Sequence, residues 1–177
     1  LWSAANLNGT GIFCNGADAV QTYDGTTWGA LTGSPPSGAR YASVYANHAV
    51  LAGTAANPNR VYFSDIGVPT TWPVASFIDV LSFDGDIITG LGVAGDGQLT
   101  VLKRNSIWAI SGTDMQTFSQ RQIDADVGCT GFRTITPING WLYFLSEWGP
   151  YRTRAGEVHP LVTPDDLAIQ NTFRTSL

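Results

Sequence analysis

The stretch from residue 99 to residue 112, LTVLKRNSIWAISG, contains the clearest structural pattern in the sequence. Two apolar runs, Leu99–Leu102 and Ile107–Ile110, stand on either side of the polar triplet KRN. Short β-prone runs joined by a polar turn predict an antiparallel hairpin. We expect Lys103 and Arg104 to lie at the tip of this hairpin.

The second half of this hairpin belongs to a degenerate repeat. Runs similar to Ile107–Ile110 are found at Val20–Tyr23, Val61–Ser64 and Pro150–Thr153. They begin at positions 20, 61, 107 and 150, which places them about 40 to 50 residues apart. A glycine closes each run, and a Thr-aromatic pair follows in three of the four. A period of this length has room for about four strands and is typical of propeller blades.

The sequence therefore predicts an all-β, propeller-like fold with about four degenerate blades, each of four antiparallel strands. We expect a single domain with blades at residues 1–38, 39–84, 85–129 and 130–177. The blades either close as a small propeller or form an arc of a larger one. An ordinary β-sandwich is the alternative interpretation of the same strands. The helical pattern matches only one short segment, Pro164–Gln170.

The composition agrees with an all-β protein and disfavours other classes. The chain has 177 residues, of which 44% are hydrophobic and 13% are charged, and its formal net charge is −5. A disordered chain would be richer in charge and poorer in aromatic residues. A helical bundle would be rich in Glu, Lys, Ala and Leu, whereas Lys103 is the only lysine here. A nucleic-acid-binding protein would normally be basic.

The ends of the chain and its cysteines give weaker indications. The sequence starts without Met, and we expect it to be part of a longer chain. Neither a signal peptide nor a membrane span is recognised, so we expect no secretion by a signal peptide. Cys14 and Cys129 have no further ligands at metal-site spacing. We expect both to be buried thiols, with a bridge between them as the alternative.

Two phrases, Thr22–Trp28 and Ser64–Trp72, are similar to the Asp-box turns of sialidase propellers. In that motif the Asp accepts hydrogen bonds from turn amides, the Gly takes a positive φ, and the Trp packs in the blade. Trp108 and Tyr151, from the repeated strands, are also expected to pack within blades. The residues predicted to have such structural roles are Asp24, Gly25, Trp28, Asp65, Gly67, Trp72, Trp108 and Tyr151.

The acidic pairs and histidines are weaker candidates for chemistry. Asp84–Asp86 and Asp124–Asp126 could be glycosidase carboxylates or calcium ligands. Acids this close on one turn rarely reach the spacing that glycoside hydrolysis requires, so we expect them to cap turns. We expect His48 and His159 to be surface turn residues. The sequence predicts no catalytic residue, no metal site and no cofactor.

Basic and aromatic residues form the candidate interaction surface, which consists of Lys103, Arg104, Trp148, Arg152 and Arg154. Arg152 and Arg154 alternate on one predicted strand and so share a face of the sheet. These cations could contact phosphate groups or the aspartates of a neighbouring subunit. Trp148 could stack on a sugar or anchor a subunit contact, and packing in the core is the alternative.

Longer phrases carry a resemblance to a known family. They are RVYFSDIGVPTTWP at Arg60–Pro73, the segment Gly95–Cys129, and NGWLYFLS at Asn139–Ser146 with Gly149–Arg152 after it. Together they resemble the β-propeller parts of tailed-bacteriophage structural proteins. That group includes tail-nozzle proteins, head-to-tail stabilisation proteins and tail-hub components. The resemblance covers about residues 40–155 and is a pattern of phrases, with no catalytic fingerprint among them.

This resemblance implies a structural part of the virion that is made in the host cytoplasm and has no active site or cofactor. Its partners would be other copies of the chain and neighbouring tail or portal proteins, in an oligomeric ring around the DNA channel. DNA would make only passing contact, and no membrane span is expected. The similarity to Asp-box turns leaves an alternative, a carbohydrate-binding or glycoside-hydrolysing propeller.

Overall fold

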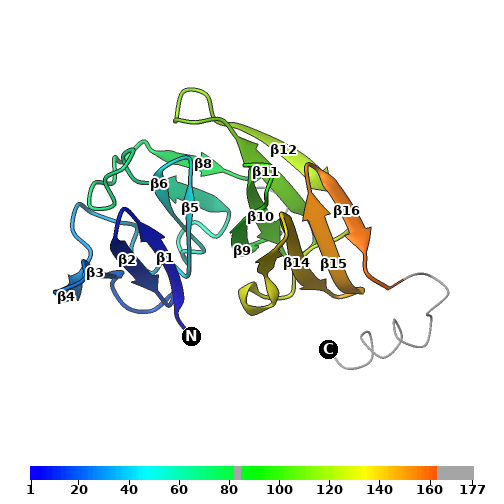
Figure 1. Cartoon of the computed structure of the whole chain (residues 1–177), viewed down its shortest axis with the longest axis horizontal. Helices are drawn as coiled ribbons and strands as arrows, with labels where there is room; N and C mark the ends of the chain where they lie inside the picture. The colour runs from blue at the N-terminus through cyan, green and yellow to red at the C-terminus, as the bar shows by residue number, and fades with distance from the viewer. Residues whose placement is uncertain (82–84, 163–177) are drawn as a thin grey trace. The chain divides into compact units, whose positions relative to one another are not determined.

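The structure is a computed structural model that describes residues 1–81 and 85–162 (Figure 1). Within these ranges it contains strands β1 to β16 and one short 3-10 helix, η1 (Phe132–Thr134). The described residues do not include the segment expected to be helical, Pro164–Gln170. They also do not include Asp84, the first acid of the pair Asp84–Asp86. No helix in the described part of the chain is long and apolar enough to span a membrane.

The strands form four sheets of four strands each. Sheet 1 contains β1 (Ser3–Leu7), β2 (Thr10–Cys14), β3 (Gln21–Tyr23) and β4 (Trp28–Ala30). Sheet 2 contains β5 (Tyr41–Tyr45), β6 (His48–Ala52), β7 (Arg60–Phe63) and β8 (Phe77–Asp79). Sheet 3 contains β9 (Ile88–Val93), β10 (Leu99–Lys103), β11 (Ile107–Ser111) and β12 (Ser119–Asp124). Sheet 4 contains β13 (Thr136–Ile138), β14 (Trp141–Ser146), β15 (Gly149–Arg154) and β16 (Glu157–Pro160).

Strand order within each sheet follows the chain, and consecutive strands run antiparallel. The four runs of the sequence repeat fall in β3, β7, β11 and β15, which are the third strands of the four sheets. The repeat therefore marks equivalent positions in four similar units. The predicted all-β class with four-stranded antiparallel sheets is confirmed.

Tight turns join many of the strands. Asn139 and Gly140 have φ values of 51° and 81° and connect Ile138 to its partner Trp141. Two successive positive φ values are typical of the hairpin turn that Asn-Gly favours. A similar turn at Ala46 and Asn47, with φ values of 47° and 60°, has no such sequence signature.

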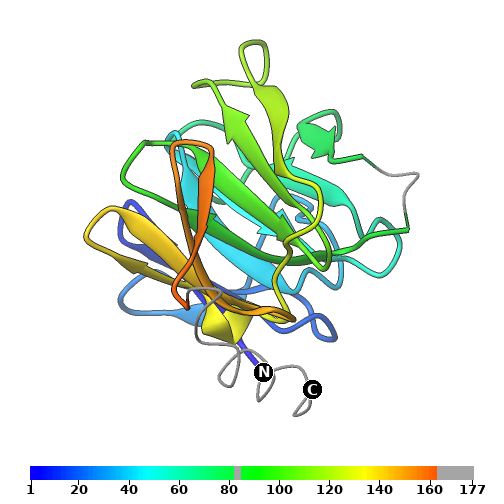
Figure 2. The ribbon, with the colours of Figure 1, turned by 90° about the vertical axis from the view of Figure 1, so that its right-hand side faces the viewer.

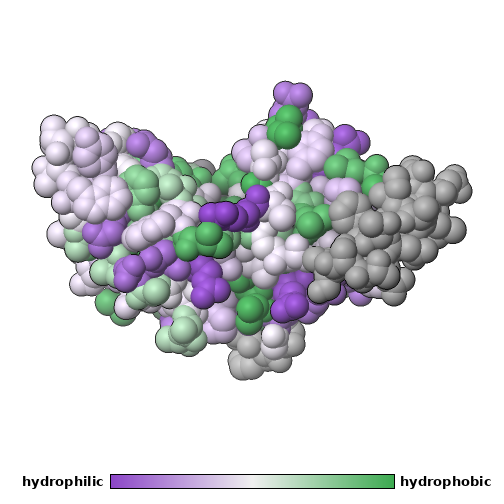
Figure 3. All heavy atoms as spheres, turned by 90° about the horizontal axis from the view of Figure 1, so that it is seen from below, coloured by the Kyte–Doolittle hydropathy of each residue, from purple (hydrophilic) through white to green (hydrophobic). Residues whose placement is uncertain are grey.

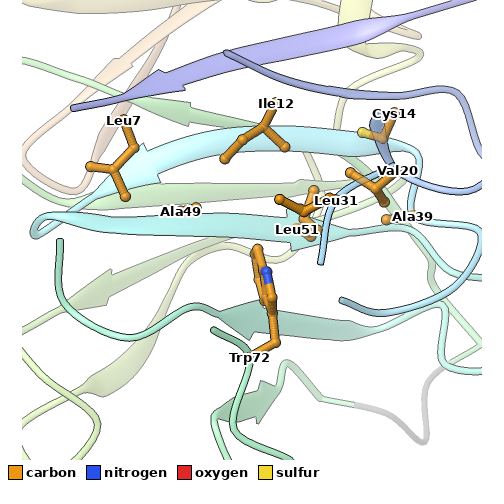
Figure 4. Close-up of a cluster of buried hydrophobic side chains, with 9 residues drawn as sticks. All are labelled: Leu7, Ile12, Cys14, Val20, Leu31, Ala39, Ala49, Leu51 and Trp72. Atoms are coloured by element: carbon orange, nitrogen blue, oxygen red, sulfur yellow. The ribbon is translucent and has the colours of Figure 1, made fainter. Parts of the chain in front are cut away.

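The chain divides into two compact units. Unit 1 contains Leu1–Ile88 and the loop Ser111–Ser119. Its hydrophobic core joins sheets 1 and 2, and Figure 4 shows the Trp72 ring pointing toward Leu51 and Leu31 in this core. The buried residues of this core are Leu7, Ile12, Cys14, Val20, Leu31, Ala39, Ala49, Leu51 and Trp72.

The loop Ser111–Ser119 completes unit 1 by packing against sheet 2. The centroid of the Phe118 ring lies 4.7 Å from that of Phe63 and 5.5 Å from that of His48. The Tyr45 hydroxyl donates a 2.8 Å hydrogen bond to the carbonyl oxygen of Gly112. His48 is thus buried, which corrects the expectation of a surface turn residue. The turn consists of the two preceding residues alone. His48 is already the first residue of β6, a strand in which every residue is buried.

Unit 2 contains Thr89–Ile110 and the chain from Gln120 onward. Its core is formed by Ala94, Leu102, Ile107, Cys129, Leu142 and Phe144. Two backbone hydrogen bonds join separate segments of this unit: Gly95 N donates to Gly140 O at 2.9 Å, and Cys129 N, in the segment after β12, donates to Lys103 O at 2.8 Å. Figure 2 shows the β15–β16 hairpin of sheet 4 in orange. Cys14 and Cys129 are both buried free thiols.

The surface reflects the low charge of the sequence. On the face seen in Figure 3, strongly hydrophilic residues form small separate groups among apolar ones. This pattern follows from the stacking of sheets, because residues that lie between two sheets are removed from water and few positions remain for charged side chains.

Candidate interaction surface

Lys103 does not belong to an exposed surface, which corrects its predicted place at a hairpin tip. It is the last residue of β10, and it is fully buried, at 0% exposure. The hairpin exists as predicted, but its turn is shorter because Lys103 N donates to Ser106 O. Lys103 also accepts a hydrogen bond at its carbonyl from Cys129 N. Every residue of β10 is buried, so the strand has no solvent-facing side on which a cation could lie.

Arg104 and Trp148 are exposed near each other at one end of sheet 4. The Arg104 Nε lies 3.7 Å from Oε1 of Glu147, the residue that precedes Trp148 in the β14–β15 turn. Both partners of this ion pair are largely exposed to solvent, and such pairs contribute little to stability. Trp148 is 47% exposed.

Arg152 and Arg154 lie on β15 and share one face of sheet 4, as their alternation predicted. They approach the face of the Trp141 ring, with guanidinium carbons 4.3 Å and 6.0 Å from the ring centroid. His159 packs edge-on against the same ring, at 5.7 Å between ring centroids, and its Nε2 lies 3.1 Å from Oε2 of Glu157. We call these five residues the arginine face.

The arginine face is held in place by the opposite side of the same strands. Leu142 and Phe144 of β14 point into the core of unit 2, and the Tyr151 ring stacks on Phe144 at 6.1 Å. Alternation along a strand then sends Trp141 and Arg152 to the other side. An arginine stacked on an aromatic ring gains about 0.5–2 kcal/mol, more when water is excluded. The arrangement presents cations on an aromatic support.

Strand register separates the predicted surface residues into two groups. Trp148 lies in the turn before β15, whereas Arg154 lies at the far end of that strand, five residues beyond Gly149. At about 3.3 Å per residue these positions are on the order of 17 Å apart. The structure therefore does not bring all five predicted residues into one surface.

Sequence reasoning missed Trp141, Glu157 and His159 as members of the arginine face. The signal was available in part, because the Asn-Gly turn fixes the start of β14. The register of β15 with β16, which pairs Arg152 with His159, depends on a turn at Ala155–Gly156. Asp96 accepts a hydrogen bond from the Ala155 backbone N–H and so helps to hold this turn.

The first Asp-box-like phrase forms the expected turn. Asp24 Oδ1 accepts hydrogen bonds from the backbone N–H of Thr27 at 2.7 Å and of Thr26 at 2.9 Å. These bonds lower the pKa of Asp24 below its ordinary value, and the bond from Thr27 has the largest effect. Gly25 has a φ of 100°. Trp28 differs from the expectation of blade packing, because it is 55% exposed and its ring lies against Phe13 on the outer side of sheet 1.

The second phrase closes its turn differently. Here the backbone N–H of Asp65 donates to Thr71 O, and Gly67, with a φ of 70°, donates to Asn47 O. Trp72 is buried, with 6% exposure, and its indole N–H donates to Pro69 O.

The remaining predicted packing residues are buried or half-buried. Trp108 is buried, and its indole N–H donates to the Ser106 hydroxyl. Burial, and then the negative charge of Asp124, raise the pKa of Tyr151.

Asp124, one of the aspartates that suggested chemistry, is used in a turn. Asp124 Oδ1 accepts from the backbone N–H of Asp126 and of Val127, both at 2.9 Å. Asp114 Oδ1 likewise accepts hydrogen bonds from the backbone N–H of Gln116 and of Thr117. Among the described residues, no cluster of three or more His, Cys, Asp and Glu side chains has metal-site geometry.

Unit 1 contains an open pocket of about 230 Å³ beside sheet 2. Tyr62, Phe63 and Trp72 supply aromatic walls, and Arg60 supplies a cation. The Arg60 guanidinium makes two hydrogen bonds to Asp79, at 2.7 Å and 2.8 Å, and its carbon lies 3.6 Å from the Phe77 ring centroid. The hydrogen bonds to Asp79 raise the pKa of Arg60.

The comparisons with known proteins concern the fold. The structure is similar to a solved structure of streptogramin B lyase, with a TM-score of 0.61 and 20% sequence identity over 89% of this chain. The chain has a propeller-like β fold. It spans about half of that lyase chain, 53%, and at this identity the likeness extends to the fold alone. No protein-family model and no curated protein sequence matches the chain.

Proposed function

We propose that this chain is a non-enzymatic structural component of a bacteriophage tail or head-to-tail junction. In this proposal it is made in the host cytoplasm, carried in the virion, and part of an oligomeric ring around the DNA channel. Its partners are other copies of itself and neighbouring tail or portal proteins. The phrases of residues 40–155 that resemble phage propellers support this assignment.

The observation that carries the proposal furthest is the arginine face of sheet 4. Arg152 and Arg154 are stacked on Trp141, so their charges are displayed on a rigid strand. Arg and Trp are enriched among the residues that dominate subunit contacts. With a net charge of −5, the whole chain repels DNA at long range. Two surface arginines would then give DNA passing contact without retention.

The use of aspartate also supports a structural role. Asp24, Asp114 and Asp124 accept backbone hydrogen bonds within their own turns. A glycosidase needs a pair of carboxyls directed at one bond, with a raised pKa on one of them. The pKa of Asp24 is shifted the other way, downward.

The proposal is tested by the genes that neighbour the parent gene and by reconstitution. We expect portal and terminase genes nearby, and we expect the purified chain to join a ring with the encoded portal or tail protein in native mass spectrometry. Turnover of aryl glycosides that disappears in Asp126→Asn would contradict the proposal. Neighbouring genes of carbohydrate metabolism, with no ring formed, would also contradict it.

A second candidate function, carbohydrate binding, is favoured by the pocket of unit 1. Aromatic walls with a few polar groups are typical of sites that take a sugar ring. At about 230 Å³ the pocket is smaller than most ligand sites, which suits a single ring. A glycan array tests this candidate: Tyr62→Ala should abolish binding, and Trp148→Ala, far along the chain, should not. Absence of binding by the unchanged chain would contradict it.

A further inference from the structure

The pocket of unit 1 is lined by β7 and by two loops. Backbone hydrogen bonds hold these loops in place. The Trp72 N–H donates to Gly33 O at 3.2 Å, and the Phe63 N–H donates to Ser76 O at 2.9 Å. All residues that line the pocket belong to unit 1. Its walls are therefore fixed by contacts within one unit.

The Arg60 guanidinium is held in one orientation beside this pocket. Asp79 occupies the Nε and Nη2 nitrogens of Arg60, and the Phe77 ring lies against the guanidinium carbon, at 3.6 Å. The hydrogen bonds of the described residues leave the Nη1 nitrogen of Arg60 unused. Because a guanidinium is flat and rigid, the bond to Asp79 also fixes the direction of these remaining donors. Arg60 therefore supplies preoriented N–H groups to the pocket.

The other polar groups of the pocket are also short of free acceptors. The Tyr62 hydroxyl oxygen accepts a 3.1 Å hydrogen bond from Asn57 Nδ2, which leaves its own hydrogen to donate. The carbonyl of Pro73 already accepts from Ser76 N–H, and that of Ser76 accepts from Phe63 N–H. No Asp or Glu is among the described residues that line the pocket. A neutral sugar has hydroxyls that donate as well as accept, whereas a carboxylate only accepts.

We propose that this pocket binds a small ring compound that bears a carboxylate. The carboxylate accepts from the free N–H groups of Arg60 and from the Tyr62 hydroxyl. The ring lies against the apolar side chains of Pro36, Trp72 and Pro73. A volume of about 230 Å³ is below the range of drug-sized ligands, which suits a single ring.

The charges around the pocket favour a carboxylate over a phosphate. Arg60 is the one cation among the described lining residues, and Asp79 already balances its charge. The ligand is therefore held by directed, charge-assisted hydrogen bonds more than by net charge. A phosphate carries up to two negative charges and would find no second cation here. Repulsion from the net charge of −5 is screened beyond about 8 Å at physiological ionic strength.

This inference rests on the pocket of the carbohydrate-binding candidate and narrows its ligand to an acidic sugar. The same chemistry is also present in an aromatic acid, so the test includes both sources. Binding of an aromatic acid without any sugar would support this inference and overturn the carbohydrate candidate. Binding of glucose as tight as that of glucuronate would overturn this inference and leave the carbohydrate candidate standing.

Nuclear magnetic resonance titration with matched probes tests the ligand class. The two pairs are glucuronate with glucose, and benzoate with benzamide, so each pair differs in the charge of one group. We expect at least one acid to shift the indole N–H signal of Trp72 and to bind about tenfold more tightly than its neutral partner. Tighter binding of glucose 6-phosphate than of glucuronate, or no binding of any probe, would overturn the proposal.

Variants of Arg60 test the contact itself. Arg60→Gln removes the donors, and Arg60→Lys retains the charge without the planar fork, so both should lose most of the preference for the acid. Arg133→Gln, at an exposed arginine of η1 in unit 2, makes the same change in net charge and should retain the preference. The preference is a ratio within one variant, so a partly unfolded preparation does not alter it. An undiminished preference in Arg60→Gln, or equal losses in Arg60→Gln and Arg133→Gln, would overturn the proposal.

Discussion

Trp72 and Trp28 end two similar phrases of the sequence, but their surroundings differ. Trp72 is enclosed in the core of unit 1 and donates its indole hydrogen bond to Pro69. Trp28 lies on the outer side of sheet 1 and is mostly exposed. Sequence phrases can therefore identify a turn without indicating which tryptophan the core requires.

Truncation of the two tryptophans should separate these roles. Trp72→Ala leaves a cavity and should lower the free energy of unfolding by about 3–5 kcal/mol. Trp28→Ala removes only a partly exposed ring and should cost less than about 1 kcal/mol. Urea unfolding followed by circular dichroism measures both. Equal losses in the two variants would contradict the burial difference.

Lys103 provides a test of burial at a charged residue. It is the only lysine in the chain and is fully buried. An amine-reactive ester should therefore modify the N-terminus of the folded chain and reach Lys103 only after unfolding in urea. Mass spectrometry of the peptides measures the two sites. Rapid modification of Lys103 in buffer would contradict the position of β10.

The Cys14 thiol should make stability depend on alkaline pH. Burial raises the pKa of Cys14 from 9.0 to about 12. Because the folded pKa lies above the unfolded one, the protonated thiol contributes its full stabilisation below about pH 8.5. This contribution is lost as the pH rises toward 12. Unfolding of the unchanged chain and of Cys14→Ala between pH 8 and 11 measures the difference, which should shrink as pH increases.

At the scale of elements, glycines decide how closely segments approach. A Cβ added at Gly128 would collide with the backbone carbonyl of Arg104 in the β10–β11 turn. A Cβ at Gly131 would meet no atom within 4 Å. The φ of Gly131, 177°, is extended backbone that any residue can adopt. These two glycines therefore form a matched pair in one short segment.

We expect Gly128→Ala to lower the unfolding free energy by more than about 1 kcal/mol, because backbone cannot yield as a side chain can. Gly131→Ala should be neutral or stabilising by a few tenths of a kcal/mol. Thermal unfolding of both variants measures the contrast. A neutral Gly128→Ala would show that the 103–106 turn is not held against this segment.

The sequence allowed the elements to be predicted better than the candidate surface. The four similar runs, each closed by a glycine, located the third strand of each sheet, because this signal lies within one short segment. The burial of Lys103 was not predictable, since alternation disappears where both sides of a strand are covered. Trp141 and His159 were missed because their approach to Arg152 depends on register across three strands. Local sequence does not contain that information.

At the scale of the whole molecule, unit 1 depends on residues that come late in the chain. The loop Ser111–Ser119 packs Phe118 against Phe63 and His48, although residues 89–110 belong to unit 2. Phe118 is half-buried, so Phe118→Ala should cost about 1–3 kcal/mol and accelerate hydrogen exchange in β5–β7. Phe118→Leu, which retains most of the volume, is the control. Faster exchange confined to sheet 3 would contradict this packing.

The same loop has a consequence for synthesis of the chain. Domains usually fold as they leave the ribosome, N-terminal units first. Unit 1 cannot assemble in full at residue 88, because the ring of Phe118 is not yet made. By the time residue 119 is available, the whole β9–β11 segment has also been translated. Sheet 2 therefore remains incompletely covered until about thirty further residues have been translated. We expect chaperones to bind this sheet mainly during that interval.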